Sequence, residues 1–269
     1  MFSETEPILN EYHQLNLSEV IDFEKFNNYS ITHHSTTIEG SALTEVETRL
    51  LLDEGITPAG KPLLHSLMVQ DHYQALLFAA EAAKQKQPVH ISFIQTLNAK
   101  IMRQTGSIYQ TAFGEIDASK GMFRKGNVSA GATYFVNFDK VEKLVAELAE
   151  TISGKMQTIN TTEEQLNLAF DAHFDLVTIH PFYDGNGRTS RLLMNFIQLF
   201  FQLPPAIVFK EDKAAYFEAL QDARKTEDIS VFRTFMYAQY RKQLGNEIEK
   251  YKKLQSSDTK KGGGFSLVF

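Results

Sequence analysis

The residues best suited to chemistry lie close together in the segment His180–Arg191, which reads HPFYDGNGRTSR. Pro181 disfavours helical backbone at the residue before it, so a helix is expected to end at His180. The turn Gly185–Gly187 tolerates positive φ angles, which lets successive backbone N–H groups point into one concavity. A second helix should begin directly after this turn, with free N–H groups and the positive end of its dipole. The segment therefore predicts a binding site for a polyphosphate.

Four titratable or charged side chains accompany this predicted anion site. Arg188 and Arg191 are spaced i, i+3, so both guanidinium groups can lie on one side of the second helix. Two arginines oppose the dipole at a helix N-terminus, and that conflict disappears when an anion binds there. Asp184 would be repelled by phosphate unless a cation lay between them, which favours Mg²⁺ held by one carboxylate and phosphate oxygens. His180 can accept a proton near neutral pH, and we expect it to deprotonate an incoming hydroxyl.

Each of these features has a common structural interpretation when it occurs alone. A histidine at a helix end is usually structural, an Asp-Gly-Asn-Gly stretch is usually only a turn, and an arginine pair usually marks a solvated helix face. All of them together on one loop and one helix start favour a functional site.

The elements that must position this segment are mostly helices. Apolar residues recur at i, i+3 and i+4 along most of the chain, and the sequence TEVE at 44–47 is typical of a capping box. Helices are predicted over 44–54, 64–85, 92–103, 139–153, 162–180, 188–201, 211–224 and 229–252. The stretch 106–137 contains five glycines and favours a short hairpin or an extended flap. The predicted fold class is mainly α with one small β element.

Composition excludes several classes of protein. The chain has 269 residues, no cysteine and a net charge of −6. The absence of cysteine excludes disulfides and thiolate metal sites, and the acidic balance disfavours nucleic-acid partners. No signal peptide or long apolar segment is evident, so we expect no membrane partner and a cytoplasmic location.

At every fixed position, His180–Arg191 resembles the signature of the Fic (Fido) family, HPFx[D/E]GNGRxxR. The resemblance implies a Fic-type helical bundle with a small β-hairpin flap over the active site. It also implies transfer of AMP from ATP, with Mg²⁺, to a Ser, Thr or Tyr hydroxyl of a protein. The roles it implies are general base for His180, metal ligand for Asp184, phosphate binding through the backbone for Gly185, Asn186 and Gly187, and β- and γ-phosphate contacts for Arg188 and Arg191.

Two further regions resemble parts of the same family. The segment 123–131 is similar to the flap that registers a target segment by strand addition, and its residues Val128, Ser129, Ala130 and Gly131 are expected beside the nucleotide. The pair Tyr216-Phe217 resembles a Tyr-Tyr pair that lines the adenine pocket, with Phe in the second position.

A third region, Ser35–Gly40, resembles the family's inhibitory motif [Ser/Thr]-x-x-x-Glu-[Gly/Asn]. Ser35 and Glu39 are spaced i, i+4 and should share one face of a short helix that Gly40 terminates. Glu39 then lies at a helix C-terminus, which is unfavourable for an anion, so we expect Arg191 to be its partner. The resemblance implies an autoinhibited adenylyltransferase, able in some cases to reverse its own modification.

The predicted organisation has three regions: an N-terminal helical region over 1–100 that carries the inhibitory motif at 35–40, a Fic catalytic domain over 101–240, and a C-terminal helix end with a Gly-rich tail over 241–269. Phe265–Phe269 is expected to dock as a terminal strand. Expected partners are a target protein, the chain itself as a target, and a second copy in a homodimer. Two alternatives stay open at this point: a transferase with another nucleotide or phosphate donor, and a nucleotide-sensing module without turnover.

Overall fold

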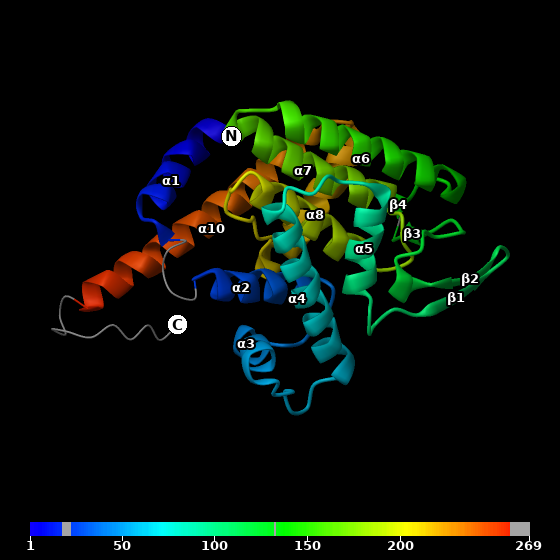
Figure 1. Cartoon of the computed structure of the whole chain (residues 1–269), viewed down its shortest axis with the longest axis horizontal. Coiled ribbons are helices and arrows are strands. Elements are labelled where there is room, and N and C mark those ends of the chain that lie inside the picture. The colour runs from blue at the N-terminus through cyan, green and yellow to red at the C-terminus, as the bar shows by residue number, and fades with distance from the viewer. Residues whose placement is uncertain (18–22, 132, 259–269) are drawn as a thin grey trace.

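The computed structural model describes residues 1–17, 23–131 and 133–258 (Figure 1). The mainly helical fold class is confirmed. The elements in chain order are α1 (Phe2–Gln14), α2 (Phe23–Ile38), α3 (Glu45–Glu54), α4 (Leu63–Lys84), α5 (Ile91–Ile101), β1 (Ile108–Thr111), β2 (Gly114–Asp117), η2 (Ala118–Lys120), β3 (Ser129–Ala130), β4 (Thr133–Tyr134), η3 (Phe138–Lys140), α6 (Val141–Thr158), α7 (Thr162–Ile179), α8 (Asn186–Phe200), η4 (Lys210–Asp212), α9 (Lys213–Thr226) and α10 (Ile229–Asp258).

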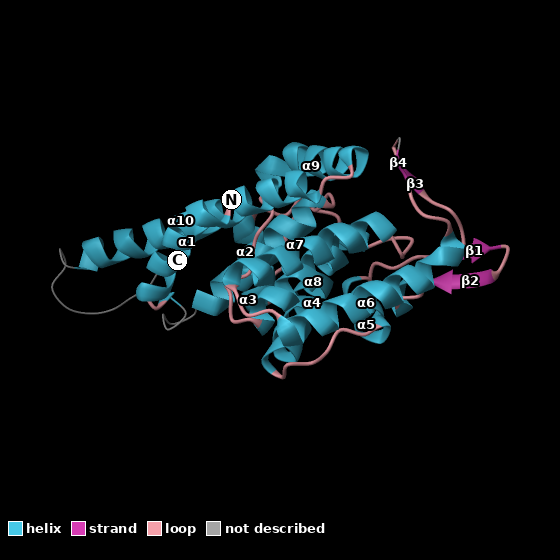
Figure 2. Cartoon of the chain, turned by 90° about the horizontal axis from the view of Figure 1, so that it is seen from above, coloured by secondary structure: helices cyan, strands magenta, loops and turns pink. Residues whose placement is uncertain are grey.

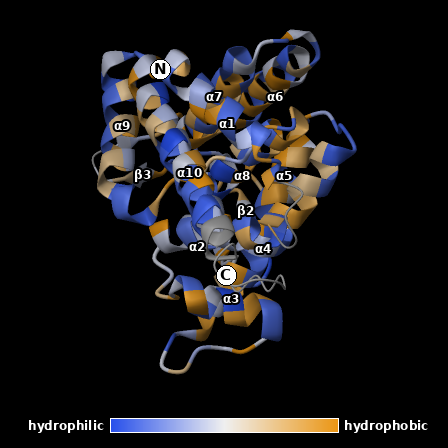
Figure 3. Cartoon of the chain, turned by 90° about the vertical axis from the view of Figure 1, so that its left-hand side faces the viewer, coloured by the Kyte–Doolittle hydropathy of each residue, from blue (hydrophilic) through white to orange (hydrophobic). Residues whose placement is uncertain are grey.

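The helix pair α7 and α8 forms the centre of the bundle, with α4, α5, α6 and α10 packed around it (Figure 2). Five consecutive or nearly consecutive residues of α8 are fully buried, namely Leu192, Leu193, Met194, Phe196 and Ile197. Polar residues of α8 such as Asn195 and Gln198 are buried as well, so the helix is enclosed around most of its circumference. The outer helices combine hydrophobic and hydrophilic residues (Figure 3). The loop between α7 and α8 is therefore fixed at both ends by the core.

The N-terminal helices belong to the same packed body. One hydrophobic core cluster extends from Leu9 in α1 to Ile248 in α10, because α1 packs along α10. The core thus runs through all three predicted regions, and their division stays a prediction. Helix α2 is much longer than the short helix expected around Ser35, since Tyr29 and Ile31 extend its buried face toward the N-terminus.

The β structure differs from the single small element that the glycine-rich stretch predicts. Strands β1 and β2 pair antiparallel from Ile108↔Asp117 to Thr111↔Gly114, and β3 and β4 form a second hairpin. Between them Gly121 has a φ of 64°, and a Cβ there would lie 2.1 Å from the Gln95 carbonyl oxygen, so a side chain at this position would clash with α5. This tight turn divides the stretch into two hairpins.

Among the described residues, no helix is both long and apolar enough to cross a membrane. The prediction for Phe265–Phe269 lies outside the described residues.

Candidate active site

His180 lies where α7 ends, as Pro181 predicts. It has a left-handed backbone with a φ of 53°, and its N–H still donates to the carbonyl of Leu176 at 3.0 Å. Nδ1 lies 3.3 Å from the Val177 carbonyl, which can only accept, so Nδ1 carries the proton and Nε2 is the basic nitrogen. The ring of Phe135 stacks on the imidazole at 3.8 Å between centroids and 15° between planes. Burial lowers the pKa of His180 to about 4, so the imidazole is neutral.

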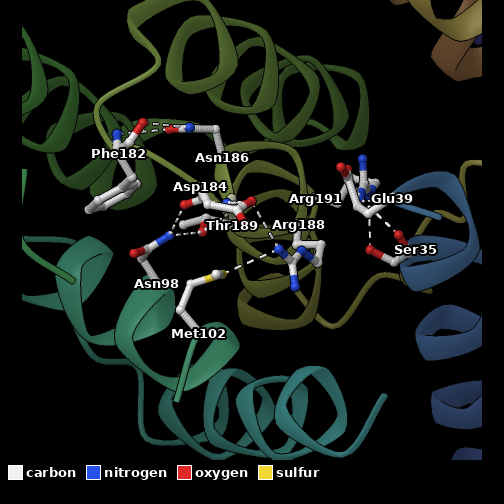
Figure 4. Close-up of polar contacts among 11 residues, drawn as sticks. Ser35, Glu39, Asn98, Met102, Phe182, Asp184, Asn186, Arg188, Thr189 and Arg191 are labelled. Carbon is white, nitrogen blue, oxygen red and sulfur yellow. Dashed lines mark hydrogen bonds and ion pairs between the residues drawn. The ribbon is translucent and has the colours of Figure 1, made fainter. Parts of the chain in front are cut away.

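Asn186 closes the loop around its own side chain. Its Nδ2 donates to the Phe182 carbonyl at 2.8 Å, and its Oδ1 accepts from the Phe182 N–H at 2.9 Å (Figure 4). Phe182 is buried against Phe123. The side chain of Asn186 therefore shapes the turn, and its backbone N–H is left at the start of α8.

Helix α5 supports the turn from below. Gly185 has a φ of 79°, and a Cβ there would lie 2.7 Å from Asn98 Nδ2 and 2.9 Å from Met102 Sδ. Asn98 Nδ2 donates to the Asp184 carbonyl and to Thr189 Oγ1, both at 3.1 Å (Figure 4). Sequence reasoning missed Asn98 and Met102. The signal for Asn98 in the sequence is its position, because it is an asparagine on the otherwise apolar face of the helix predicted over 92–103.

Arg188 is buried, and not all of its guanidinium nitrogens are hydrogen-bonded. Its Nη2 lies 3.2 Å from both Asp184 Oδ1 and Met102 Sδ. Its Nε and Nη1 are buried without a hydrogen-bond partner among the described residues. The Asp184 side chain, by contrast, is 52% exposed. A buried cation with unused donors next to an open carboxylate is suited to an anion that arrives together with a metal ion.

Arg191 has quite different partners, on α2 and the residue after it. Its Nε donates to Ser35 Oγ at 2.9 Å, and its Nη2 donates to the Ser35 carbonyl at 3.0 Å and to Glu39 Oε1 at 2.7 Å (Figure 4). The structure thus brings the predicted pair Glu39 and Arg191 together. Gly40 has a φ of 102° and turns the chain directly after Glu39.

Glu39 also contacts the first turn of α8. A Cβ on Gly187 would lie 2.5 Å from Glu39 Oε1, so the carboxylate lies against the helix N-terminus where an anion is favoured. Burial alone would raise the pKa of Glu39, but Arg191 and Arg188 hold it below its usual value. The Glu39 carboxylate therefore lies where a phosphate group is predicted to bind.

The predicted flap residues form the exposed β3–β4 hairpin. Ser129 and Ala130 are exposed in β3 and pair with Tyr134 and Thr133. Val128 precedes the strand and Gly131, with a φ of 58°, begins its turn. Within the described part of the chain, β3 pairs only with β4, which leaves its other edge open to a further strand.

The predicted aromatic pair is divided between core and surface. Tyr216 is 1% exposed, with its hydroxyl 3.0 Å from His173 Nε2 and its ring centre 6.0 Å from the Arg191 Cζ. Phe217 is 41% exposed. Of the two, only Phe217 presents its ring to solvent, and Tyr216 lies behind Arg191.

No group of three or more His, Asp or Glu side chains in the described ranges could hold a metal ion alone. Asp184 fits an ion that takes its remaining ligands from phosphate and water, which is the usual manner of Mg²⁺.

Residues 88–198 match the model of the Fic/DOC family. Over these residues the chain is similar to the Fic/DOC family. Protein adenylyltransferase Fic of Drosophila melanogaster is 29% identical over 205 residues, which cover 76% of this chain and 39% of that protein. The chain therefore spans about two fifths of the length of the curated relatives it matches.

Solved structures share the fold. A Fic-domain-containing signaling protein from Bacteroides thetaiotaomicron aligns over 92% of this chain and 96% of that chain, with a TM-score of 0.79 and 23% identity. Fic-1 from C. elegans aligns over 92% of this chain and 70% of that chain, with a TM-score of 0.73 and 23% identity. The Fic/DOC match contains His180–Arg191 and both hairpins, whereas Ser35–Gly40 and Tyr216-Phe217 lie outside it.

Proposed function

We propose that this protein is an adenylyltransferase that moves AMP from ATP to a Ser, Thr or Tyr hydroxyl of a protein, and that Glu39 holds it in an autoinhibited state. The observation that carries the proposal is the juxtaposition of a neutral His180 with an anion site built by α8. The name of the Drosophila relatives supports the choice of reaction.

His180 is oriented to accept one proton, from the attacking hydroxyl. Because Nδ1–H of His180 faces the Val177 carbonyl, Nε2 can take the proton of an attacking hydroxyl. The hydroxyl oxygen forms a bond to the α-phosphorus, the bond between that phosphorus and the bridging oxygen to the β-phosphate breaks, and pyrophosphate leaves. The proton stays on His180 until solvent removes it.

The phosphates have donors at the start of α8. The Thr189 N–H is the first to bond within the helix, to the Gly185 carbonyl at 2.8 Å, so the N–H groups of Asn186, Gly187 and Arg188 precede the ladder. The unused Nε and Nη1 of Arg188 add two charged donors. Asp184 would hold Mg²⁺, which offsets the negative charge of the phosphates when it is bound.

Autoinhibition follows from what occupies Arg191. Its Nη2 and Nε are engaged by Glu39 and Ser35, so they are not available to a γ-phosphate. The Glu39 carboxylate also adds negative charge next to Gly187. ATP would then bind in a pose that does not align the α-phosphate with the attacking oxygen, and small misplacements of this kind are costly in rate. The same proposal includes a protein target, modification of the chain by itself, the reverse reaction that removes AMP, assembly into a homodimer and a cytoplasmic location.

The reaction is tested with the full chain carrying Glu39→Gly. The protein is incubated with Mg²⁺ and, separately, ATP, GTP, UTP and CTP labelled at the α-phosphate. We expect covalent label from ATP in excess of the other three. Label from another nucleotide instead would contradict the choice of ATP, and no covalent label from any donor would contradict transferase activity.

A further inference from the structure

Arg124 is a buried cation whose partners are backbone carbonyls. It is 1% exposed, and its three guanidinium nitrogens each donate to a different carbonyl: Nε to His180 at 2.8 Å, Nη1 to Gly126 at 2.8 Å and Nη2 to Val136 at 2.5 Å. Its own backbone N–H donates to the Pro181 carbonyl at 3.0 Å. A charged group with this burial requires several hydrogen bonds to offset its desolvation, and here the carbonyls supply them.

These contacts join the β3–β4 hairpin to the catalytic loop. Gly126 lies on the segment that enters the hairpin, and Val136 lies on the segment that leaves it. The hairpin itself has only two residue pairs, Ser129↔Tyr134 and Ala130↔Thr133, which is too short to hold its own position. Arg124 therefore fixes both ends of the hairpin against the residue that we propose as the base.

The contacts of Arg124 fix the position of the His180 imidazole in two ways. Its carbonyl accepts from Arg124 while the backbone holds a φ of 53°, a conformation that non-glycine residues adopt only when their surroundings enforce it. Phe135 stacks on the ring and is the neighbour of Val136, another residue whose carbonyl accepts from Arg124. Loss of the guanidinium would release the backbone of the base and the aromatic ring that covers it.

We propose that Arg124 is a positioning residue that holds the target-registering hairpin and His180 in one fixed geometry, so that a segment paired with β3 delivers its hydroxyl to Nε2. This rests on the proposed function. Arg124 has no hydrogen bond to Gly185–Arg191, so it acts on the target and the base without acting on the nucleotide site.

Lysine cannot take over this role. An ammonium on a flexible stem is a single point donor, whereas the planar guanidinium directs donors to carbonyls on three separate segments. Arg124→Lys keeps the charge and most of the volume, and it tests the geometry alone. Arg233→Lys is the matched control. Arg233 donates to both carboxylate oxygens of Asp171, at 2.7 and 2.6 Å, and lysine would lose this two-pronged contact as well. The contact connects α10 to α7 away from the hairpin.

The pKa of His180 provides a readout that is independent of transfer. The charged groups facing its imidazole are Arg124, Arg224 and Glu39, and burial is the main cause that lowers its pKa to about 4. When Arg124→Lys releases the hairpin, Phe135 no longer covers the ring and water reaches it. The pKa of His180 should then rise toward the ordinary value of about 6.5.

The experiment compares three full-length proteins in the Glu39→Gly background: the background itself, Arg124→Lys and Arg233→Lys. We expect Arg124→Lys to lower the labelling rate at least about tenfold, to keep the Kd for ATP within about twofold, and to raise the pKa of His180 in an NMR titration by at least about one unit. Arg233→Lys should lower the Tm without moving the pKa of His180. An Arg124→Lys protein with an unchanged pKa of His180 and an unchanged labelling rate would overturn the inference.

Failure of the proposed function gives a different result. If the Glu39→Gly background itself does not label, the adenylyltransferase proposal fails, and the His180 titration still decides whether Arg124 positions the base. If Arg124→Lys and Arg233→Lys lower the Tm equally and both leave the pKa of His180 unchanged, Arg124 has only a structural role and the inference fails.

Discussion

The Glu39 carboxylate lies between the Arg191 guanidinium and the first turn of α8. Its Oε1 is 2.7 Å from Arg191 Nη2, and a Cβ placed on Gly187 would be 2.5 Å from the same oxygen. Three favourable interactions for an anion therefore meet at one carboxylate: an arginine, a second arginine nearby and a helix N-terminus. Under the proposed function, Glu39 therefore occupies the place that a phosphate would take.

This contact can be measured through Gly187→Ala. In the wild-type chain the added methyl group would push against Glu39, and we expect a destabilisation of about 1–3 kcal/mol. In the Glu39→Gly background the oxygen is absent, so most of that cost should disappear. Urea unfolding of the four proteins gives the coupling energy. An equal cost of Gly187→Ala in both backgrounds would show that Glu39 does not lie on the helix start.

Replacement of His180 tests the base. His180→Ala in the Glu39→Gly background should lower the transfer rate by about 10²–10⁴-fold, since the attacking hydroxyl loses its proton acceptor. The Kd for ATP should stay nearly the same, because the proposed phosphate donors are on α8. The exposed His13→Ala is the control. Transfer within about tenfold of the background would sink the assignment.

Replacement of Asp184 tests the metal ligand. Asp184→Ala should remove Mg²⁺-dependent transfer, because we propose this half-exposed carboxylate as the ligand that holds the ion beside the phosphates. The measurement is the labelling rate as a function of Mg²⁺ concentration, with the exposed Asp222→Ala as control. A Mg²⁺ titration with the same midpoint and the same plateau as the background would assign the ligand elsewhere.

Acid should weaken the fold around α2. Burial, assisted by Lys210 beside His33, lowers the pKa of His33 and of His34 from 6.5 to about 4. The folded state therefore resists protonation at these residues, and their contribution to stability is fully present above pH 6.5 and is lost as the pH falls toward 4. Each proton taken up only by the unfolded chain adds a slope of about 1.4 kcal/mol per pH unit.

The measurement is the free energy of unfolding between pH 7 and pH 4 for the wild type and for His33→Gln, with the exposed His13→Gln as control. His33→Gln should have the shallower dependence on pH. Parallel curves for all three proteins would contradict the role of the buried histidines.

Much of the loop between α7 and α8 could be predicted from the sequence because its constraints are local. Pro181 ends α7 and Gly185 begins α8 through backbone preferences that do not depend on the rest of the fold. The pairing of Glu39 with Arg191 could be predicted only from the resemblance, since the two residues are 152 positions apart. Physical chemistry on its own showed that Glu39 needed a partner.

The rest depends on tertiary packing that leaves no local pattern. In the sequence Arg124 is one residue of the flap-like segment 123–131, and no local pattern shows that its guanidinium is buried against the carbonyls of His180, Gly126 and Val136. Tyr216 lies in the core because α9 packs on α10, although its spacing also suits a pocket wall. The structure has two hairpins where the sequence predicted one, because Gly121 packs against α5. The spacing of the glycines does not specify that contact.

Under the proposed function, Glu39 restrains an adenylyltransferase by engaging Arg191. The most direct test is intact-mass analysis of the full chain after incubation with Mg²⁺ and ATP, for the wild type, Glu39→Gly, Arg191→Ala and the double variant. We predict at least about tenfold more AMP-modified protein for Glu39→Gly than for the wild type, equivalent to about 1.4 kcal/mol or more in the barrier, and no activation by Glu39→Gly when Arg191 is absent. Equal modification of the wild type and Glu39→Gly would contradict the account.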